Sequence, residues 1–342
     1  MRIHKHLTAC LLLLTCLGGL LSLPARAAED LLLVYTLARQ ADPVFSAAAA
    51  ARDAALEVVP QSRAVLLPNI GLGGDVSRDR FDPRTAEPTS YATNKTYSVQ
   101  LRQSLYQRDR FVQLEQADNQ AAQAEAEFST ARQDLMLRVT TAYFVVLGAL
   151  DNLEFVSADK EAVGRTLDQA KQRFEVGLTA ITDVHEAQAR YDLAVSELIN
   201  AEKLLDDARE ALREITGETH REIEVLQAEI PLVGPEPTDQ AQWVETALEQ
   251  NPALLAAMAV TEAARNEVEV QRSGHYPSLD LTADYSYRDN RFGGFQDLKR
   301  NDSAVGLELN LPLYQGGLVS SKTRQSRHRF SEAQEDQERQ RR

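Results

Sequence analysis

The sequence QRDRFVQLEQADNQ (residues 107–120) opens the stretch that decides the fold, which continues through KQRFEVGLTAITDV (171–184) and closes with ALREITG (211–217). No proline interrupts it, and its apolar residues recur at alternating spacings of three and four. A spacing that averages 3.5 residues over many heptads is the seam of a coiled coil. The stretch therefore predicts two long helices that fold back on each other at a single turn. At 1.5 Å per residue, the first helix would be about 100 Å long.

The turn between these helices is expected after Glu175, where the apolar spacing breaks. Gly177 suits the left-handed conformation that ends many helices. Thr179 or Thr182 can cap the return helix, and the charge of Asp183 is favourable in its first turn.

The first 27 residues are predicted to be a cleaved signal peptide. A basic start and an apolar run from Leu7 to Leu23 precede Ala25-Arg26-Ala27, which has the small-residue pattern of a cleavage site. Both cysteines, Cys10 and Cys16, lie inside this segment. The mature fold can therefore owe nothing to disulfides, thiol catalysis or cysteine-bound metal.

The charge balance and the histidines exclude several functions. The 342-residue chain has 51 acidic and 37 basic residues and a formal net charge of −14, which disfavours a nucleic-acid partner. No run of 18 apolar residues follows the signal peptide, so no membrane-spanning helix is expected. Four isolated histidines form no catalytic or metal-binding motif, namely His185, His220, His275 and His328. We expect no enzyme, no metal and no cofactor.

The remaining segments alternate between helix and strand patterns. Residues 29–59 are rich in alanine and predicted to be helical, with a break near Pro60. After Pro68 the apolar residues alternate with polar ones, as in a strand that is apolar on one face only. A polar loop with Pro83, Pro88 and Asn94 follows, and the alternation then resumes. These residues predict a β-hairpin.

The chain repeats itself after about 209 residues. Asp42-Pro43 returns as Asn251-Pro252, and Leu67-Pro68 returns as Tyr276-Pro277. A period this long indicates a duplication of helix, hairpin and long helix rather than a solenoid. Because the second copy reaches only the equivalent of residue 134, we expect that the chain is truncated or incomplete.

The strands predict a membrane pore. Their apolar faces carry Tyr97, Tyr285 and Tyr287, the aromatic type found at membrane interfaces. Their opposite faces carry charged residues that suit a watery lumen: Arg102, Asp280, Asp284 and Glu308. Four strands cannot close a barrel, and an open edge in lipid leaves backbone groups unpaired. Two, three or four copies would give 8, 12 or 16 strands.

The sequence resembles the TolC family of trimeric outer-membrane efflux and secretion ducts. The resemblance rests on motifs spread from Ala28 to Arg342: Arg52-Asp53-Ala54-Ala55, Thr141-Ala142-Tyr143-Phe144, Phe174-Glu175-Val176-Gly177, Ala180-Ile181-Thr182-Asp183-Val184, Ile215-Thr216-Gly217 and Leu311-Pro312-Leu313-Tyr314-Gln315-Gly316-Gly317. It implies a mainly α-helical homotrimer with a shared 12-stranded transmembrane β-barrel and a periplasmic α-barrel. The trimer would give passive exit to drugs, small toxic molecules or secreted proteins. An inner-membrane pump of RND or ABC type, reached through a periplasmic adaptor, would deliver them.

The resemblance also implies roles at the turn. Gln172, Thr182 and Asp183 match positions that hold the periplasmic entrance shut through links to the second-repeat turn, whose positions fall beyond Arg342. Gly177, Leu178, Thr179 and Ala180 match the rim that meets the adaptor.

We expect eight segments. They are a signal peptide (1–27), the helix of repeat 1 (28–63), a transmembrane β-hairpin (64–106), the long periplasmic helical hairpin (107–217), an equatorial connector with a short helix (218–250), the helix of repeat 2 (251–276), a second transmembrane β-hairpin (277–314) and the truncated start of a second long helix (315–342). The alternative is a soluble periplasmic coiled-coil adaptor or structural binding module, which needs the helical hairpin but no one-sided strands.

Overall fold

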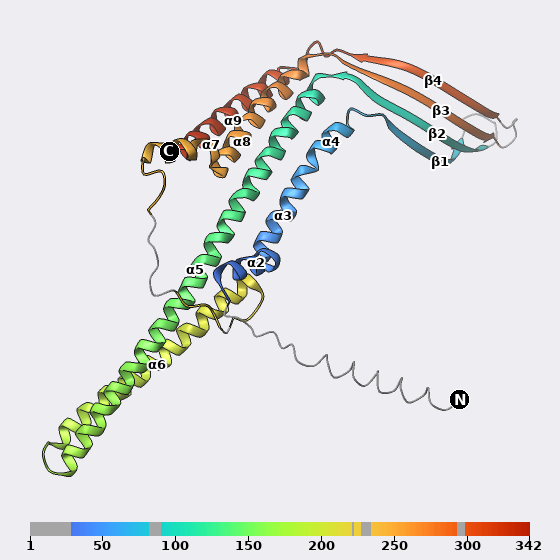
Figure 1. The fold of residues 1–342 in the computed structure, drawn as a ribbon. Helices are drawn as coiled ribbons and strands as arrows, with labels where there is room; N and C mark the ends of the chain where they lie inside the picture. Colours follow the sequence, from blue (N-terminus) through green and yellow to red (C-terminus); the bar gives the residue numbers. More distant parts are fainter. Residues whose placement is uncertain (1–28, 82–89, 221, 227–233, 293–297) are drawn as a thin grey trace, which may run out of the picture. The chain divides into compact units, whose positions relative to one another are not determined.

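The computed structural model describes residues 29–81, 90–220, 222–226, 234–292 and 298–342 (Figure 1). The predicted signal peptide and the loop with Pro83 and Pro88 lie outside the described residues. The chain divides into two compact units, Met1–Pro43 with Leu135–Leu232 and Val44–Asp134 with Val233–Arg342. The fold is mainly helical with one small sheet, as the sequence predicts.

The two long helices are α5 (Arg108–Glu175, 68 residues) and α6 (Ile181–Thr216, 36 residues). The buried positions of α6 follow the predicted seam, namely Ala194, Ala201, Leu205, Ala208 and Leu212. A Cβ atom added to Gly164 of α5 would lie 3.3 Å from the ring of Tyr191 of α6, so the two helices pack closely there (Figure 1). The predicted helical hairpin is therefore confirmed.

Glycines end both helices. Gly177 has φ 71° and Gly217 has φ 74°, the left-handed conformation that glycine adopts at little cost. After α5, Gly177 N donates to Phe174 O (3.0 Å) and Leu178 N donates to Arg173 O (2.8 Å), which is the Schellman pattern. After α6, Gly217 N donates to Arg213 O at 2.7 Å.

The predicted threonine cap of α6 is wrong. The N-cap is Ala180, which has no side chain that can accept a hydrogen bond. The hydroxyls of Thr179 and Thr182 instead contact the carboxylate of Asp183, at 3.5 Å for Thr182. Asp183 in the first turn therefore binds the two hydroxyls that could have capped the helix. Its negative charge is favourable at this end of the helix.

Between residue 29 and the first strand, the structure describes three helices: α2 (Leu31–Ala41), α3 (Pro43–Leu56) and α4 (Val58–Ala64). The helical run ends at Leu56, four residues before Pro60, because proline cannot donate to the carbonyl four residues earlier. The break therefore falls at Glu57, and Pro60 itself lies in the first turn of α4.

The second repeat has the same order of elements. It contains α7 (Gln240–Gln250), α8 (Pro252–Arg272), a 3₁₀ turn (Ser273–His275) and α9 (Leu318–Arg341). Asn251 caps α8 by accepting from Ala253 N at 2.9 Å. Helices α8 and α9 lie side by side, and Thr261 Oγ1 donates to Ala333 O at 3.2 Å (Figure 1).

The four strands form one antiparallel sheet in the order β1-β2-β3-β4 (Figure 1). They are β1 (Asn69–Phe81), β2 (Ser90–Gln107), β3 (Ser278–Phe292) and β4 (Leu298–Asn310). Asn94, expected in a loop, lies within β2 opposite Ser77. One bulge interrupts the pairing of β2 with β3, between Ser104 and Tyr106, directly before α5 begins.

The register puts the predicted apolar positions on one side of the sheet, except Leu105, which falls in the bulge, and Leu311, which follows the end of β4. Ile70 pairs with Leu101 and Leu101 with Ala283, and the same row ends at Val305 of β4. We call this side the apolar face; it comprises Ile70, Leu72, Val76, Tyr97, Val99, Leu101, Leu279, Leu281, Ala283, Tyr285, Tyr287, Val305, Leu307 and Leu309. Leu72 is 84% exposed and Val305 is 79% exposed. No described helix therefore covers this face.

We expected no helix that could span a membrane. This expectation is wrong, because one described helix is long and apolar enough to do so. Helix α5 contains an 18-residue window of mean hydropathy 1.3, the only such window in the described helices. The apolar residues near the middle of α5 include Leu135, Val139 and Val146, which are completely buried by the protein. Only 22% of the window is buried, however, and Leu137 in this part of α5 is 68% exposed, so the described chain covers only part of this helix surface.

An ion pair fixes the end of α2 within its unit. Asp42 is only 2% exposed, and Arg138 Nη2 and Nη1 donate to its Oδ2 and Oδ1 at 2.6 and 3.3 Å. Removing one partner of such a pair leaves a buried charge without compensation.

We predict that Arg138→Ala lowers the stability of this unit by about 2 kcal/mol, less than the loss for a fully buried pair because water reaches the site. Thermal unfolding of the purified protein measures the effect. The matched control is Arg165→Ala, whose partner Glu161 is exposed, so its loss should stay below about 0.5 kcal/mol. Equal losses in the two variants would contradict the buried-pair interpretation.

Candidate sites at the helical turn and on the sheet

The turn between α5 and α6 places three of the sequence-predicted site residues together. Thr179 and Thr182 both donate to Asp183, which is exposed. Gln172 is also exposed, on the last turns of α5, and among the described residues no hydrogen bond connects it to Thr182 or Asp183. The turn thus presents a carboxylate held by two hydroxyls and a separate amide to the solvent.

The turn also exposes large apolar side chains, of which the sequence analysis named only Leu178 as a site residue. Leu178, which was predicted, is 77% exposed, and Val176 is 70% exposed. Phe174 and Ile181 on either side are exposed as well. Four exposed apolar residues within eight positions are unusual at a surface turn. The sequence already indicated this exposure, because its pattern predicts no further helix or strand beside the turn that could cover these side chains.

A shallow cavity of about 260 Å³ lies between α5 and α6 near this turn. Its apolar lining includes Val163, Ala170 and Ala187, and Asp183 lies at its border. Arg190 there forms an ion pair with Glu186 at 2.7 Å. The cavity has no buried nucleophile or acid–base pair, so it is a packing groove rather than a catalytic site.

The second side of the sheet, which we call the polar face, gathers the predicted lumen residues. Arg102 Nη2 donates to Asp280 Oδ2 at 2.8 Å and lies 3.5 Å from Glu308 Oε2. The three residues therefore form one ion cluster across β2, β3 and β4. Asp284 lies on the same face opposite Gln100 and Ala304, and it has no ion-pair partner in the described chain.

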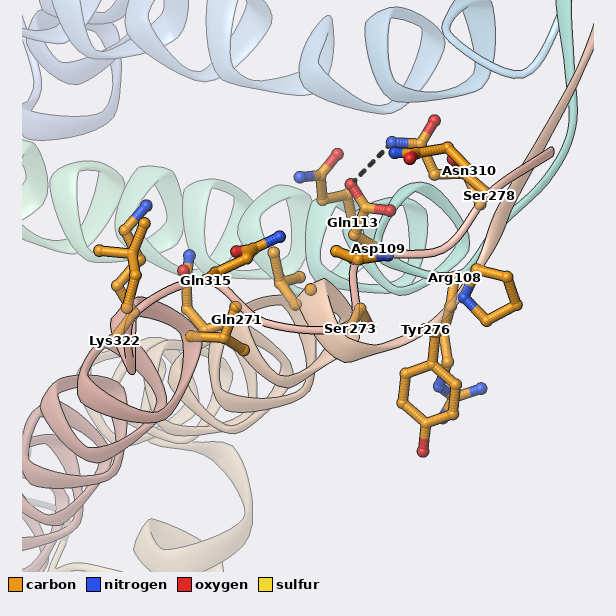
Figure 2. Close-up of a pocket in the computed structure, with 17 residues that line it drawn as sticks. Arg108, Asp109, Gln113, Gln271, Ser273, Tyr276, Ser278, Asn310, Gln315 and Lys322 are labelled. Carbon is orange, nitrogen blue, oxygen red and sulfur yellow. Dashed lines mark hydrogen bonds between the residues drawn. The ribbon is translucent and has the colours of Figure 1, made fainter. Parts of the chain in front are cut away.

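A cavity of about 380 Å³ lies where the sheet meets the helices (Figure 2). Gln107 Nε2 donates to Asp109 Oδ2 at 3.2 Å, and the guanidinium of Arg108 lies 5.7 Å from the ring of Tyr276. A Cβ atom on Gly274 would lie 3.0 Å from Cγ2 of Val319, so the side chain of Val319 packs directly against the backbone at Gly274. The cavity therefore lies between the ends of strands and helices, and many of its lining side chains are polar.

The segment before α2 is fastened in a way that the sequence did not reveal. Glu29 N donates to Glu222 O, and Glu224 N donates to Glu29 O, both at 3.1 Å. The hydroxyl of Tyr143 donates to Glu224 O at 2.9 Å. Burial first, and then the charges of Glu224 and Asp30, raise the pKa of Tyr143 above its ordinary value, so the hydroxyl stays protonated.

The side chain of Glu29 adds a further contact to this fastening. Its carboxylate contacts Nδ1 of His220, and Nε2 of His220 lies 2.6 Å from the hydroxyl of Thr216. His220 is fully buried. Both ring nitrogens are used in packing the end of α6, which leaves none for catalysis. Within the described residues, no group of three or more His, Cys, Asp or Glu could hold a metal ion.

Replacing Gly177 tests the geometry of the turn. We predict that Gly177→Ala strains the left-handed backbone by about 1–2 kcal/mol and speeds hydrogen exchange of the last amides of α5 by on the order of tenfold. Gly177→Asn is the matched control, because asparagine tolerates this conformation. Hydrogen–deuterium exchange over residues 170–185 measures both; unchanged exchange in Gly177→Ala would refute the requirement.

Comparisons with known proteins match almost the whole chain. The sequence profile of the outer membrane efflux protein family matches residues 34–218 and 243–342. The outer membrane protein TolC of Vibrio cholerae is 41% identical over 316 residues, which cover 91% of this chain and 71% of that protein. The outer membrane protein TolC of Escherichia coli is 37% identical over 322 residues, with 91% of this chain and 64% of that protein covered.

A solved structure agrees in fold. The CmeC outer membrane channel of Campylobacter jejuni superposes with a TM-score of 0.77 at 17% identity, over 91% of this chain and 67% of that one. This chain thus spans about two thirds of the length of the proteins that it matches. Because the profile covers both repeats and a relative exceeds 40% identity, the chain belongs to the outer membrane efflux protein family, whose members are transport components of the outer membrane rather than enzymes.

Proposed function

We propose that this chain is one subunit of a trimeric exit duct that crosses the outer membrane and extends into the periplasm. The observation that supports this most is the sheet. Its apolar face carries exposed side chains on all four strands, including Leu72, Val99, Tyr285 and Val305, its polar face carries an ion cluster, and the outer edges of β1 and β4 pair with no strand of the described chain. In such a sheet, lipid would cover the apolar side, and sister subunits would pair with the backbone groups of the open edges.

Three copies would place twelve strands in one barrel. The polar face would then line the lumen, where Arg102, Asp280, Asp284 and Glu308 remain hydrated. The pairing of Arg102 with Asp280 and Glu308 offsets the cost of holding these charges at one level of the wall. The soluble adaptor alternative has no support among the relatives, and it gives no reason for the exposed apolar face.

The helical hairpin would form part of the periplasmic tube. We propose that its turn contacts a periplasmic adaptor through Gly177, Leu178, Thr179 and Ala180. The neighbouring exposed Val176 and Ile181 add apolar area to that contact. An inner-membrane pump of RND or ABC type would load drugs, small toxic molecules or secreted proteins, which pass through the duct without any chemical change.

The entrance would be closed by polar links from Gln172, Thr182 and Asp183 to the turn of the second repeat. The hydroxyls of Thr179 and Thr182 orient the Asp183 carboxylate within the turn between α5 and α6. A charge held in this way is suited to a contact that must break when the duct opens.

Leu307→Arg tests whether the apolar face contacts lipid. An arginine there should cost about 2–4 kcal/mol near the bilayer midplane and reduce the amount of folded protein in the outer-membrane fraction. The control is Ala304→Arg, which places the same side chain on the polar face. Equal membrane recovery of the two variants, or recovery of the unaltered protein in the soluble periplasm, would favour the adaptor alternative.

Asp183→Ala tests the entrance. In a version of the protein with a complete second repeat, the substitution should raise single-channel conductance or open lifetime in planar bilayers, because one link of the closed state is lost. Asp206→Ala removes an equally exposed acid from the same helix away from the turn and should leave conductance unchanged. Unchanged conductance in Asp183→Ala would remove this residue from the gate.

A further inference from the structure

Toward the hairpin ends, the side of the sheet that carries the apolar face becomes charged. Strand alternation continues without a bulge toward the hairpin ends, so the side of each residue is fixed by the register. On the side of the apolar face, five of these last positions are basic and one is acidic, beside Thr93 and Tyr91. We call this set the basic band: Arg78, Arg80, Lys95, Arg291 and Lys299, with Asp289 as the acid.

The band crosses all four strands in adjacent rows. In the first row, Lys95 pairs with Asp289, and Asp289 pairs with Lys299. In the next row, Thr93 lies between Arg78 and Arg291. Arg80 follows one row further along β1. The basic residues are therefore neighbours on one surface although they come from two hairpins.

The positive charge of Lys95, Lys299, Arg78 and Arg291 is only partly compensated by the described part of the protein. Asp289 Oδ2 lies 3.4 Å from Arg291, and its Oδ1 has no hydrogen-bond partner. Within the described part of the chain, Lys95 and Lys299 form no ion pair. The guanidinium of Arg78 lies 5.0 Å from the ring of Tyr91, which leaves its charge available to an anion.

The opposite side of the sheet at the same level is different. There Arg288 and Arg300 both pair with Asp302, at 3.6 and 2.6 Å. On that side the arginines thus contact a carboxylate, whereas Lys95 and Lys299 on the side of the apolar face form no ion pair within the described residues.

The height of the band relative to the apolar face matches a lipid headgroup layer. From Leu279 to Tyr287 the apolar positions of β3 extend about 27 Å along the strand, or roughly 20 Å at a tilt near 40°. Tyr97 and Tyr287 stack at this boundary with ring centroids 6.3 Å apart, as expected of an interfacial aromatic girdle. The band begins one row beyond these tyrosines.

We propose that the basic band binds the phosphorylated headgroups of lipid in the outer leaflet of the outer membrane. The proposal rests on the proposed function, which puts the helices in the periplasm and the hairpin ends outside. Guanidinium groups bind phosphate through paired N–H donors, and lysines contribute compact charges. The lipid phosphates would neutralise the repulsion between Lys95, Lys299 and the arginines, and each subunit of the trimer would present one such site.

The test titrates the detergent-purified, full-length protein with diphosphorylated lipid A and counts bound lipid by native mass spectrometry. Each basic residue near such a surface contributes about a fivefold change in affinity. The variant Lys95→Gln/Lys299→Gln should therefore bind at least about tenfold more weakly than the unaltered protein. The same lipid without its phosphates should bind the unaltered protein as weakly as the variant binds diphosphorylated lipid A.

The matched control is Lys171→Gln/Lys203→Gln, which removes two exposed lysines from the long helices and should bind lipid A normally. Equal binding by Lys95→Gln/Lys299→Gln and the unaltered protein overturns the lipid site alone, provided that outer-membrane fractionation recovers the protein in the membrane. Competition by inorganic phosphate at the concentration of lipid A would also overturn it, since the band would then be a general anion site. Recovery of the unaltered protein in the soluble periplasm overturns the proposed function and the lipid site together.

Discussion

Unpaired backbone groups along the outer edges of β1 and β4 are the constraint on which the rest of the structure depends. Each unsatisfied N–H or C=O group in hydrocarbon costs several kcal/mol, so a sheet with an exposed apolar face and two open edges is incomplete in a single chain. In the trimer that we propose, identical neighbours pair with these edges and lipid covers the apolar face. The exposure of Leu72 and Val305, which would be a defect in a soluble monomer, then becomes a property of the assembled wall.

The duplication explains how one chain supplies both pairs of strands with matching geometry. The break at Asp42-Pro43 recurs at Asn251-Pro252, and each break starts the helix that leads toward a hairpin. Both hairpins follow a helix and lead into a helix, so the two copies have the same order of elements along the chain. The antiparallel pairing of β2 with β3 joins the two copies into one sheet, so the 170 residues between these strands can differ without disturbing the wall.

The spacing of apolar residues predicts much of this fold. The contacts that individual side chains choose could not be predicted from that spacing. The step from a spacing of two to a spacing of 3.5 located the strands, the long helices and the turn at Gly177. The threonine cap failed because Asp183 attracts both hydroxyls, which propensity alone does not weigh. Asn94 reads as a loop residue, yet its amide reaches Asp79 across the strand pair at 2.7 Å. The role of Tyr143 in fastening Glu29 depends on residues about 80 and 114 positions away, which no local pattern encodes.

The bulge between Ser104 and Tyr106 has a consequence for everything that follows it. An α-helix turns by about 100° for each residue, and α5 starts only two residues after the bulge, at Arg108. Removing the extra residue would restore regular pairing in the strand but advance the helix by one position. The side chains in the first turns of the 68-residue helix would then point in a different direction. A single irregular step in the strand thus sets the angle at which α5 begins.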